Sequence, residues 1–199
     1  NPAHSADLVN ITHRDFVDEV GPLAALRQSQ GLSVNVVDVE DLYDEFNFGN
    51  KSPQALRDFL IFARTNWKAA PRFVLLAGDS SLDPRNYLGG GAFDLVPTKL
   101  VDASYLETAS DEWFVNFDSD GVSEMAVGRL PIRNATEAST MVSKIVGFDG
   151  STRPDGVLLV SDSNDSYDFE AASAELRALV PAGINVEEIR RGQWGSGAR

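Results

Sequence analysis

Short apolar runs alternate with segments of helical periodicity over the first part of the chain. Residues 15–30 carry apolar side chains near helical spacing and end at Gly31, while Ser52 and Pro53 supply a cap and a first-turn proline for a second helix. The β-branched and apolar runs that predict strands are residues 7–11, 33–39 and 73–77. This β-α-β-α-β order predicts an α/β fold whose mostly parallel sheet is flanked by helices.

The third predicted strand, residues 73–77, has five apolar residues in a row and then stops at Gly78 and Asp79. An uninterrupted apolar run is typical of a strand that is buried on both faces. Asp79 is therefore expected at the carboxyl end of a central strand, which is where open α/β sheets build their sites.

The alternation breaks after the third strand for about fifty residues, which is too long for a plain crossover. Residues 112–117 and 124–127 are predicted to pair as a hairpin about Asp120 and Gly121. The fold class predicted is thus α/β, with a hairpin insertion in the loop after the third strand.

Alternation resumes after this insertion. Asn134 and Glu137 form a capping box for a helix that runs to residue 148. A fourth buried strand, a helix and a fifth strand are predicted at residues 156–160, 169–179 and 184–189. The turn-rich segment 151–156 divides the chain into a first α/β sub-unit, residues 1–150, and the start of a second, residues 151–199.

Composition narrows the classes of partner. The 30 acidic and 17 basic residues leave a formal net charge of −13, which disfavours binding to nucleic acid. The apolar runs are far shorter than the roughly 18 residues of a membrane span, so no membrane span is expected. The sequence has no cysteine and only two histidines, His4 and His13, so it predicts neither a disulfide framework nor a complete serine or cysteine catalytic centre.

Aspartates stand at or just after three predicted strands: Asp38, Asp79 and Asp162. Carboxylates at the carboxyl edge of a parallel sheet can bind Mg²⁺ for phosphoryl transfer, orient a histidine, or cap the next helix. Capping is favoured for Asp38, and both functional and turn interpretations stay open for Asp79 and Asp162.

A second acidic pattern lies in the insertion. Asn116, Asp118 and Asp120 place oxygen donors at alternate positions, followed by Gly121 and by Glu124. This spacing resembles a short Ca²⁺ loop, although the twelfth position of an EF-hand loop is not acidic here. A hairpin turn made by Asp and Gly explains the same residues without a metal.

Several motifs, taken in order, resemble the gingipain family of cysteine peptidases, and the resemblance spans nearly the whole chain. They are GNKSP at 49–53, FVLLAGD at 73–79, DPRNY at 83–87, VP at 96–97, SD at 110–111, GRLP at 128–131 and KI at 144–145. The resemblance implies a caspase-like α/β fold in two sub-units. It also implies a bacterial protein that is secreted or attached to the cell surface.

The same resemblance implies cleavage of polypeptides, after Arg or Lys in some members, by a Cys-His pair that would lie beyond Arg199, and it requires no cofactor. By position, Asp162 matches the acid that orients the catalytic histidine. Asp168, or Asp165 if the loop is aligned differently, matches the acid that binds a basic substrate side chain. Two alternatives stay open: an inactive peptidase-like scaffold for secretion or partner binding, and a Mg²⁺-dependent phosphotransfer domain that uses Asp38, Asp79 and Asp162.

Overall fold

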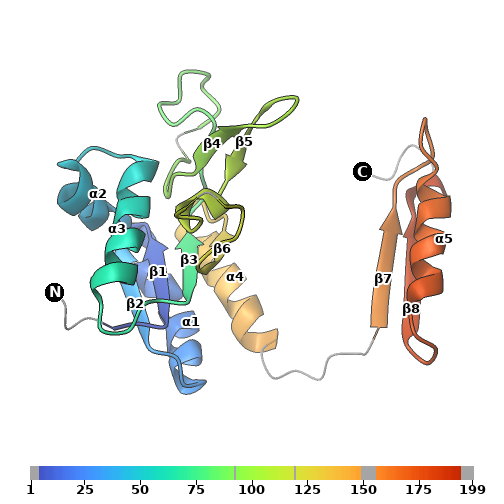
Figure 1. The fold of residues 1–199 in the computed structure, drawn as a ribbon, viewed down its shortest axis with the longest axis horizontal. Helices are drawn as coiled ribbons and strands as arrows, with labels where there is room; N and C mark the ends of the chain where they lie inside the picture. The colour runs from blue at the N-terminus through green and yellow to red at the C-terminus, as the bar shows by residue number, and fades with distance from the viewer. Residues whose placement is uncertain (1–4, 92, 119, 149–155, 194–199) are drawn as a thin grey trace. The chain divides into compact units, whose positions relative to one another are not determined.

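The computed structural model describes residues 5–91, 93–118, 120–148 and 156–193 (Figure 1). The chain divides into two compact units, Asn1–Asp149 and Gly150–Arg199. The predicted boundary at residue 150 lies outside the described residues. The strands are β1 (Leu8–Thr12), β2 (Val34–Asp38), β3 (Phe73–Ala77), β4 (Lys99–Asp102), β5 (Glu107–Ser110), β6 (Ala126–Leu130), β7 (Gly156–Ser161) and β8 (Asn185–Arg190). The helices are α1 (Val17–Ser29), α2 (Val39–Asn47), α3 (Pro53–Asn66), α4 (Ala135–Phe148) and α5 (Phe169–Leu179), with short 3₁₀ turns at Arg14–Phe16, Glu112–Phe114 and Arg191–Gln193.

The first unit is built on a four-stranded sheet in the order β2-β1-β3-β6, and every neighbouring pair is parallel. This confirms the predicted parallel sheet, and all carboxyl ends of its strands consequently lie at one edge. The fourth strand, β6, was not predicted as part of the sheet. It pairs with β3 through Leu75 and Gly128 at its centre.

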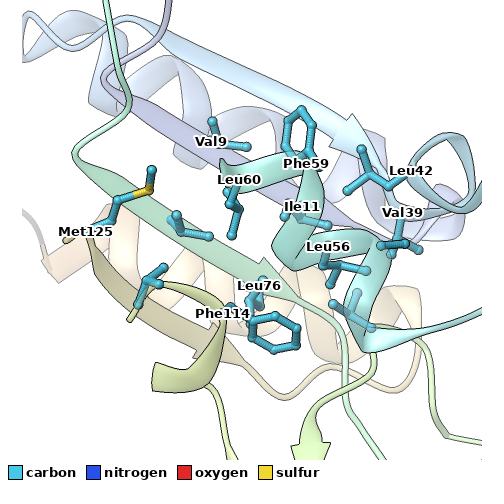
Figure 2. Close-up of a cluster of buried hydrophobic side chains, with 14 of the residues drawn as sticks. Val9, Ile11, Val39, Leu42, Leu56, Phe59, Leu60, Leu76, Phe114 and Met125 are labelled. Atoms are coloured by element: carbon cyan, nitrogen blue, oxygen red, sulfur yellow. The ribbon is translucent and has the colours of Figure 1, made fainter. Parts of the chain in front are cut away.

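Helices cover both faces of this sheet, because alternate strand residues point to opposite sides. Val9, Ile11 and Leu76 are buried on one face against side chains of α2 and α3 (Figure 2). Phe16 and Val20 form a second buried cluster that also includes Ile132 and Ala138, from the segments around α1 and α4. Each fully buried Leu, Ile or Phe contributes roughly 1.5–3 kcal/mol, so these two clusters hold the sheet between its helical layers.

The helix ends follow the local chemistry of the sequence. Ser52 Oγ accepts a hydrogen bond from the backbone N–H of Gln54 at 3.1 Å, which caps α3 as predicted. Asp38 Oδ1 accepts from the N–H of Glu40 at 3.0 Å and caps α2, a helix that the apolar pattern had not predicted. The capping interpretation of Asp38 is therefore confirmed.

The hairpin in the insertion exists, but its predicted position was wrong. β4 and β5 pair antiparallel, with Lys99 opposite Ser110. The residues predicted as its first strand instead form the 3₁₀ turn Glu112–Phe114, and those predicted as its second strand lead into β6. The error arose because residues 112–117 are apolar and aromatic for a different reason: Phe114 is buried in the main core rather than paired with a strand.

The second unit consists of the parallel pair β7 and β8 with α5 against it. Both strands were predicted, but β7 is not buried on both faces in this structure. Leu158 is 56% exposed and Val160 is 67% exposed, because α5 is the one described helix that packs on this pair and it covers the alternate side chains. Among the described residues, no helix is both long and apolar enough to cross a membrane.

Candidate functional site

The loop from β7 to α5 carries the three acidic residues that the resemblance selects. Asp162 follows the last residue of β7, Asp165 lies in a turn, and Asp168 is the residue before the first turn of α5. The structure therefore places Asp162, Asp165 and Asp168 on one loop at the carboxyl end of a parallel strand, where α/β folds hold functional groups. Their roles stay predictions.

Asp162 is an ionised, accessible carboxylate, with its side chain 51% exposed. Its Oδ1 accepts a hydrogen bond from the backbone N–H of Ser163 at 2.7 Å, and Arg191 Nη1 lies 3.1 Å from Oδ1 and 3.3 Å from Oδ2. The Ser163 N–H, together with the charge of Arg191, lowers the pKa of Asp162. Arg191 was not predicted as a site residue. Its signal is its position directly after β8, since neighbouring parallel strands bring their carboxyl ends together.

Asp165 and Asp168 also shape the loop locally. Asp165 Oδ1 accepts from the N–H of Tyr167 at 2.9 Å, and Asp168 Oδ1 accepts from the N–H of Ala171 at 2.9 Å, which caps α5. Oδ2 of Asp168 accepts no hydrogen bond from the part of the chain that the structure describes. The rings of Tyr167 and Phe169, on either side of Asp168 in the sequence, meet edge to face at 5.0 Å. One carboxylate oxygen is thus available beside two exposed aromatic rings.

The two aspartates at strand ends of the first unit do not form a pair. Asp38 lies 3.4 Å from Arg14 Nε, while Asp79 accepts from the N–H of Ser80 at 2.9 Å and lies 3.1 Å from Arg133 Nε. Because β1 separates β2 from β3, the ends of these strands are about 10 Å apart. Asp162 belongs to the second unit, so the described part of the first unit offers no shared magnesium site made by these side chains.

The predicted calcium residues form a compact loop whose carboxylates bind its own backbone. Asp118 accepts from the N–H of Asp120 at 3.2 Å, Asp120 from that of Val122 at 2.7 Å, and Glu124 from that of Phe117 at 2.8 Å. Asn116 Oδ1 is buried without a hydrogen-bond partner among the described residues. Within residues 5–91, 93–118, 120–148 and 156–193, no group of three or more His, Cys, Asp and Glu side chains is arranged to hold a metal ion. Residue 119 lies outside the described residues, and the calcium site stays a prediction.

Arg129 organises the carboxyl edge of the first sheet, although it was not predicted as a site residue. Its Nε and Nη2 each lie 2.7 Å from an oxygen of Asp111. Its Nη1 donates to the carbonyls of Gly78 at 2.7 Å and Val96 at 2.6 Å, and its Nη2 donates to Pro97 at 3.2 Å. One guanidinium in β6 therefore ties the end of β3 to two segments of the insertion. The available signal was the GRLP motif at 128–131, in which a charge interrupts an apolar strand.

A second arginine, Arg57 in α3, holds the remainder of the insertion. Its guanidinium donates to the backbone carbonyls of Trp113 and Phe117, the latter at 3.1 Å. It also lies 4.6 Å from the centroid of the Trp113 ring and 5.8 Å from that of Phe117. Lys99 and Arg64 lie over the same two rings at 5.5 and 6.0 Å. Three cations and two rings thus alternate in a stack that fixes the predicted calcium loop to α3.

A sequence model of peptidase family C25 matches residues 1–195 of this chain. The chain belongs to that family. This confirms the resemblance to gingipains that the ordered motifs carried. A comparison with curated protein sequences finds no match.

Solved structures share the fold. Dimeric latent PorU from Porphyromonas gingivalis superposes with a TM-score of 0.63 at 20% identity, over 81% of this chain and 20% of PorU. A structure described only as a protease gives 0.61 at 17% identity, over 80% of this chain and 33% of that one. The Arg-specific cysteine proteinase gingipain R (RgpB) gives 0.70 at 14% identity, over 96% of this chain and 42% of RgpB.

These matches confirm the caspase-like α/β fold. The chain spans less than half the length of each of these three structures. Its 199 residues include no cysteine, so the nucleophile of a cysteine peptidase is not among them. What the chain does contribute is a fold and a set of carboxylates at the ends of parallel strands.

Proposed function

We propose that this chain is the non-nucleophilic part of a cysteine endopeptidase that cleaves polypeptides. The observation that carries the proposal is the family C25 match over residues 1–195, together with the acidic loop at the carboxyl end of β7. A cysteine peptidase needs a thiolate, a histidine that activates it, and a third group that orients the imidazole. In this proposal the catalytic histidine and cysteine belong to a part of the protein outside these 199 residues.

In this proposal Asp162 orients the catalytic histidine. Its lowered pKa keeps it ionised, and an ionised carboxylate both accepts the imidazole N–H and stabilises an imidazolium. Three contacts use Oδ1, the closest at 2.7 Å, whereas Oδ2 is contacted by Arg191 alone among the described residues, at 3.3 Å. Oδ2 is therefore the atom to which the imidazole N–H donates.

Asp168 binds a basic side chain of the substrate, which gives cleavage after Arg or Lys. Its Oδ2 is available while Oδ1 caps α5, and the neighbouring rings of Tyr167 and Phe169 offer faces on which a guanidinium stacks. Asp165 is the alternative partner for the same cation. It ranks second because its Oδ1 already accepts the backbone N–H of Tyr167 and closes a turn.

The protein acts outside the cell or at its surface, as the family resemblance implies, and it needs no cofactor for catalysis. Recovery of the protein from culture medium tests the location.

A Ca²⁺ loop formed by Asn116, Asp118, Asp120 and Glu124 stabilises the insertion. The buried Oδ1 of Asn116 supports this, because it has no hydrogen-bond partner among the described residues. A Ca²⁺-dependent rise in the melting temperature that Asp120→Asn abolishes tests the loop.

Two alternative functions make different predictions. A Mg²⁺-dependent phosphotransfer domain that uses Asp38, Asp79 and Asp162 requires, within the first unit, that Asp38 and Asp79 share an ion, and the separation of β2 and β3 by β1 argues against it. An inactive scaffold for secretion or partner binding requires only the fold. It predicts no peptide cleavage by the full-length protein under any condition.

The full-length protein tests the two carboxylate roles separately with isosteric substitutions. Asp162→Asn is expected to lower kcat by a hundredfold or more, on the order of the loss when an orienting acid is removed, without changing the preference for Arg over Gln before the cleaved bond. Asp168→Asn retains the helix cap but is expected to raise KM for Arg substrates and to abolish that preference. Equal effects of the two variants on kcat and preference would overturn the assignment.

A further inference from the structure

A separate cavity of about 390 Å³ lies in the first unit beside the amino end of α3. Its walls come from the segment before α3, from the long loop after β3 and from the start of β4, which project beyond the carboxyl ends of the sheet strands (Figure 1). It is lined by Lys51 and Pro53, by Arg85 and Asp94, and by Lys99. The proposed catalytic carboxylates do not line it.

Positive charge is concentrated in this cavity. Two of the four lysines of the chain, Lys51 and Lys99, line it together with Arg85, against a single lining carboxylate, that of Asp94. The whole chain carries a net charge of −13, so three cationic residues against one carboxylate contrast with the composition of the chain as a whole. Such a local excess of cationic residues favours an anionic ligand.

Asp94 neutralises only one of the three cations. Its side chain is 6% exposed, with one oxygen 2.9 Å from Lys51 Nζ and the other accepting from the N–H of Ser81 at 3.1 Å. This ion pair, in which only the Asp94 side is buried, holds Lys51 in the wall of the cavity. Neither Arg85 nor Lys99 has a carboxylate within 4.0 Å among the described residues.

The contacts that Arg85 and Lys99 do make leave their charge available. Lys99 Nζ lies 5.5 Å from the centroid of the Trp113 ring, and Arg85 Nη1 donates to the hydroxyl of Tyr87 at 3.2 Å. Neither a ring face nor a neutral hydroxyl cancels a full charge. Two cationic residues that line the cavity therefore have no carboxylate partner among the described residues and contact neutral groups instead.

The remaining wall is mostly apolar: Pro53, Pro84, Pro97 and Leu100 line the same space, together with the hydroxyl residues Ser81 and Thr98. A small inorganic anion would contact the cations and leave most of this volume and its apolar wall unused. A glutamate side chain within a peptide fits both features, because its methylene groups pack on the prolines while its carboxylate reaches the cations. Rigid proline walls also cost little entropy when a peptide binds.

We infer that this cavity binds an acidic peptide segment through a glutamate carboxylate held by Lys99 and Arg85. The site is distinct from the carboxylate loop of the second unit and recognises the opposite charge. Its occupancy does not depend on peptidase activity, so the two proposals succeed or fail independently.

The test is a fluorescence anisotropy titration of the full-length protein with a labelled peptide that contains three glutamates, two prolines and no basic residue. Its twin with glutamine in place of glutamate is the matched ligand. The variant is Lys99→Met with Arg85→Gln, and the control is Lys68→Met with Lys144→Met, which removes the same charge from exposed positions outside the cavity. Thermal melting of each variant shows that the fold is retained.

The glutamate peptide is expected to bind at least tenfold more tightly than its glutamine twin, and the cavity variant to lose about tenfold in affinity while the control loses less than twofold. Millimolar inorganic phosphate is expected not to displace the peptide. Absence of binding, equal affinity for the two peptides, or an equal loss in the control would overturn the inference. Displacement by phosphate would do the same, because it would reveal a general anion site.

Discussion

Arg129 and Asp111 form a two-pronged ion pair in which Nε and Nη2 of the arginine each lie 2.7 Å from one carboxylate oxygen. Asp111 Oδ1 also accepts a hydrogen bond from Thr98 Oγ1 at 3.0 Å, in addition to its bond with Nη2. The pair joins β6 to the end of the β4-β5 hairpin across the carboxyl edge of the sheet. A planar guanidinium makes these contacts together with those to the carbonyls of Gly78 and Val96, which the ammonium of lysine cannot do.

Replacing Arg129 with lysine is expected to destabilise the protein by about 2–4 kcal/mol, because a partly buried carboxylate and three backbone carbonyls lose donors. Urea unfolding measures the loss. Arg133→Lys is the control, since Arg133 is more exposed, pairs with the single carboxylate of Asp79 and otherwise lies over the Phe93 ring, and the substitution should cost less than about 1 kcal/mol. Equal losses would show that the network at Arg129 has no special weight.

Substitution of Arg57 tests whether the stack of cations and aromatic rings stabilises the insertion. Arg57→Met keeps an aliphatic side chain of similar length but removes the donors to the carbonyls of Trp113 and Phe117. We expect a loss of about 2–3 kcal/mol in the free energy of unfolding and a changed Trp fluorescence spectrum. Arg64→Met, at the exposed end of the same stack, is expected to cost less than about 1 kcal/mol. A spectrum unchanged in Arg57→Met would contradict the stacking.

Gly128 and Gly78 are predicted to respond to alanine in opposite directions. A Cβ at Gly128 meets nothing within 4 Å and would extend into a cavity of about 490 Å³ that Gly128 itself lines. Gly128→Ala should therefore stabilise β6 by about 0.5–1 kcal/mol. A Cβ at Gly78 would lie 2.6 Å from Val96 Cγ2, so Gly78→Ala should destabilise. Thermal melting separates the two, and destabilisation by both substitutions would refute the first part.

The pairing of Asp162 with Arg191 predicts a dependence on pH. The folded-state pKa of Asp162 is lowered by the Ser163 N–H and by Arg191, so any stability it adds is present above its unfolded pKa and is lost as the pH falls through the folded value. Arg191→Gln should raise the pKa of Asp162 towards its ordinary value, as followed by carboxyl NMR chemical shifts. Arg177→Gln, which removes a cation paired with Glu188, should leave it unchanged. An unshifted Asp162 in Arg191→Gln would disprove the pairing.

The parallel sheet could be predicted from the sequence because the patterns that indicate its strands and helices are local. Residues 73–77 read as a strand from composition alone and are β3 in the structure, and Ser52 and Pro53 fix the start of α3 by their own chemistry. β6 was missed because Gly128 and Arg129 interrupt its apolar pattern. The charge of Arg129 is compatible with a strand at this position only because residues distant in the sequence, such as Asp111, pair with it.

The site was predicted less completely for the same reason. The ordered motifs led to Asp162, Asp165 and Asp168, and the structure places these on one loop. Arg191 contacts Asp162 from 29 positions away, and the cavity with Lys99 and Arg85 is assembled from segments far apart in the sequence. Neither arrangement leaves a pattern of spacing along the chain.

Peptide hydrolysis by the full-length protein, with and without prior treatment with iodoacetamide, tests the central proposal most directly. We predict cleavage after Arg or Lys that alkylation of the thiol abolishes and that Asp162→Asn lowers by a hundredfold or more, on the order expected for loss of an orienting acid. Cleavage that survives alkylation, or an intact protein that cleaves no peptide at all, would contradict the account.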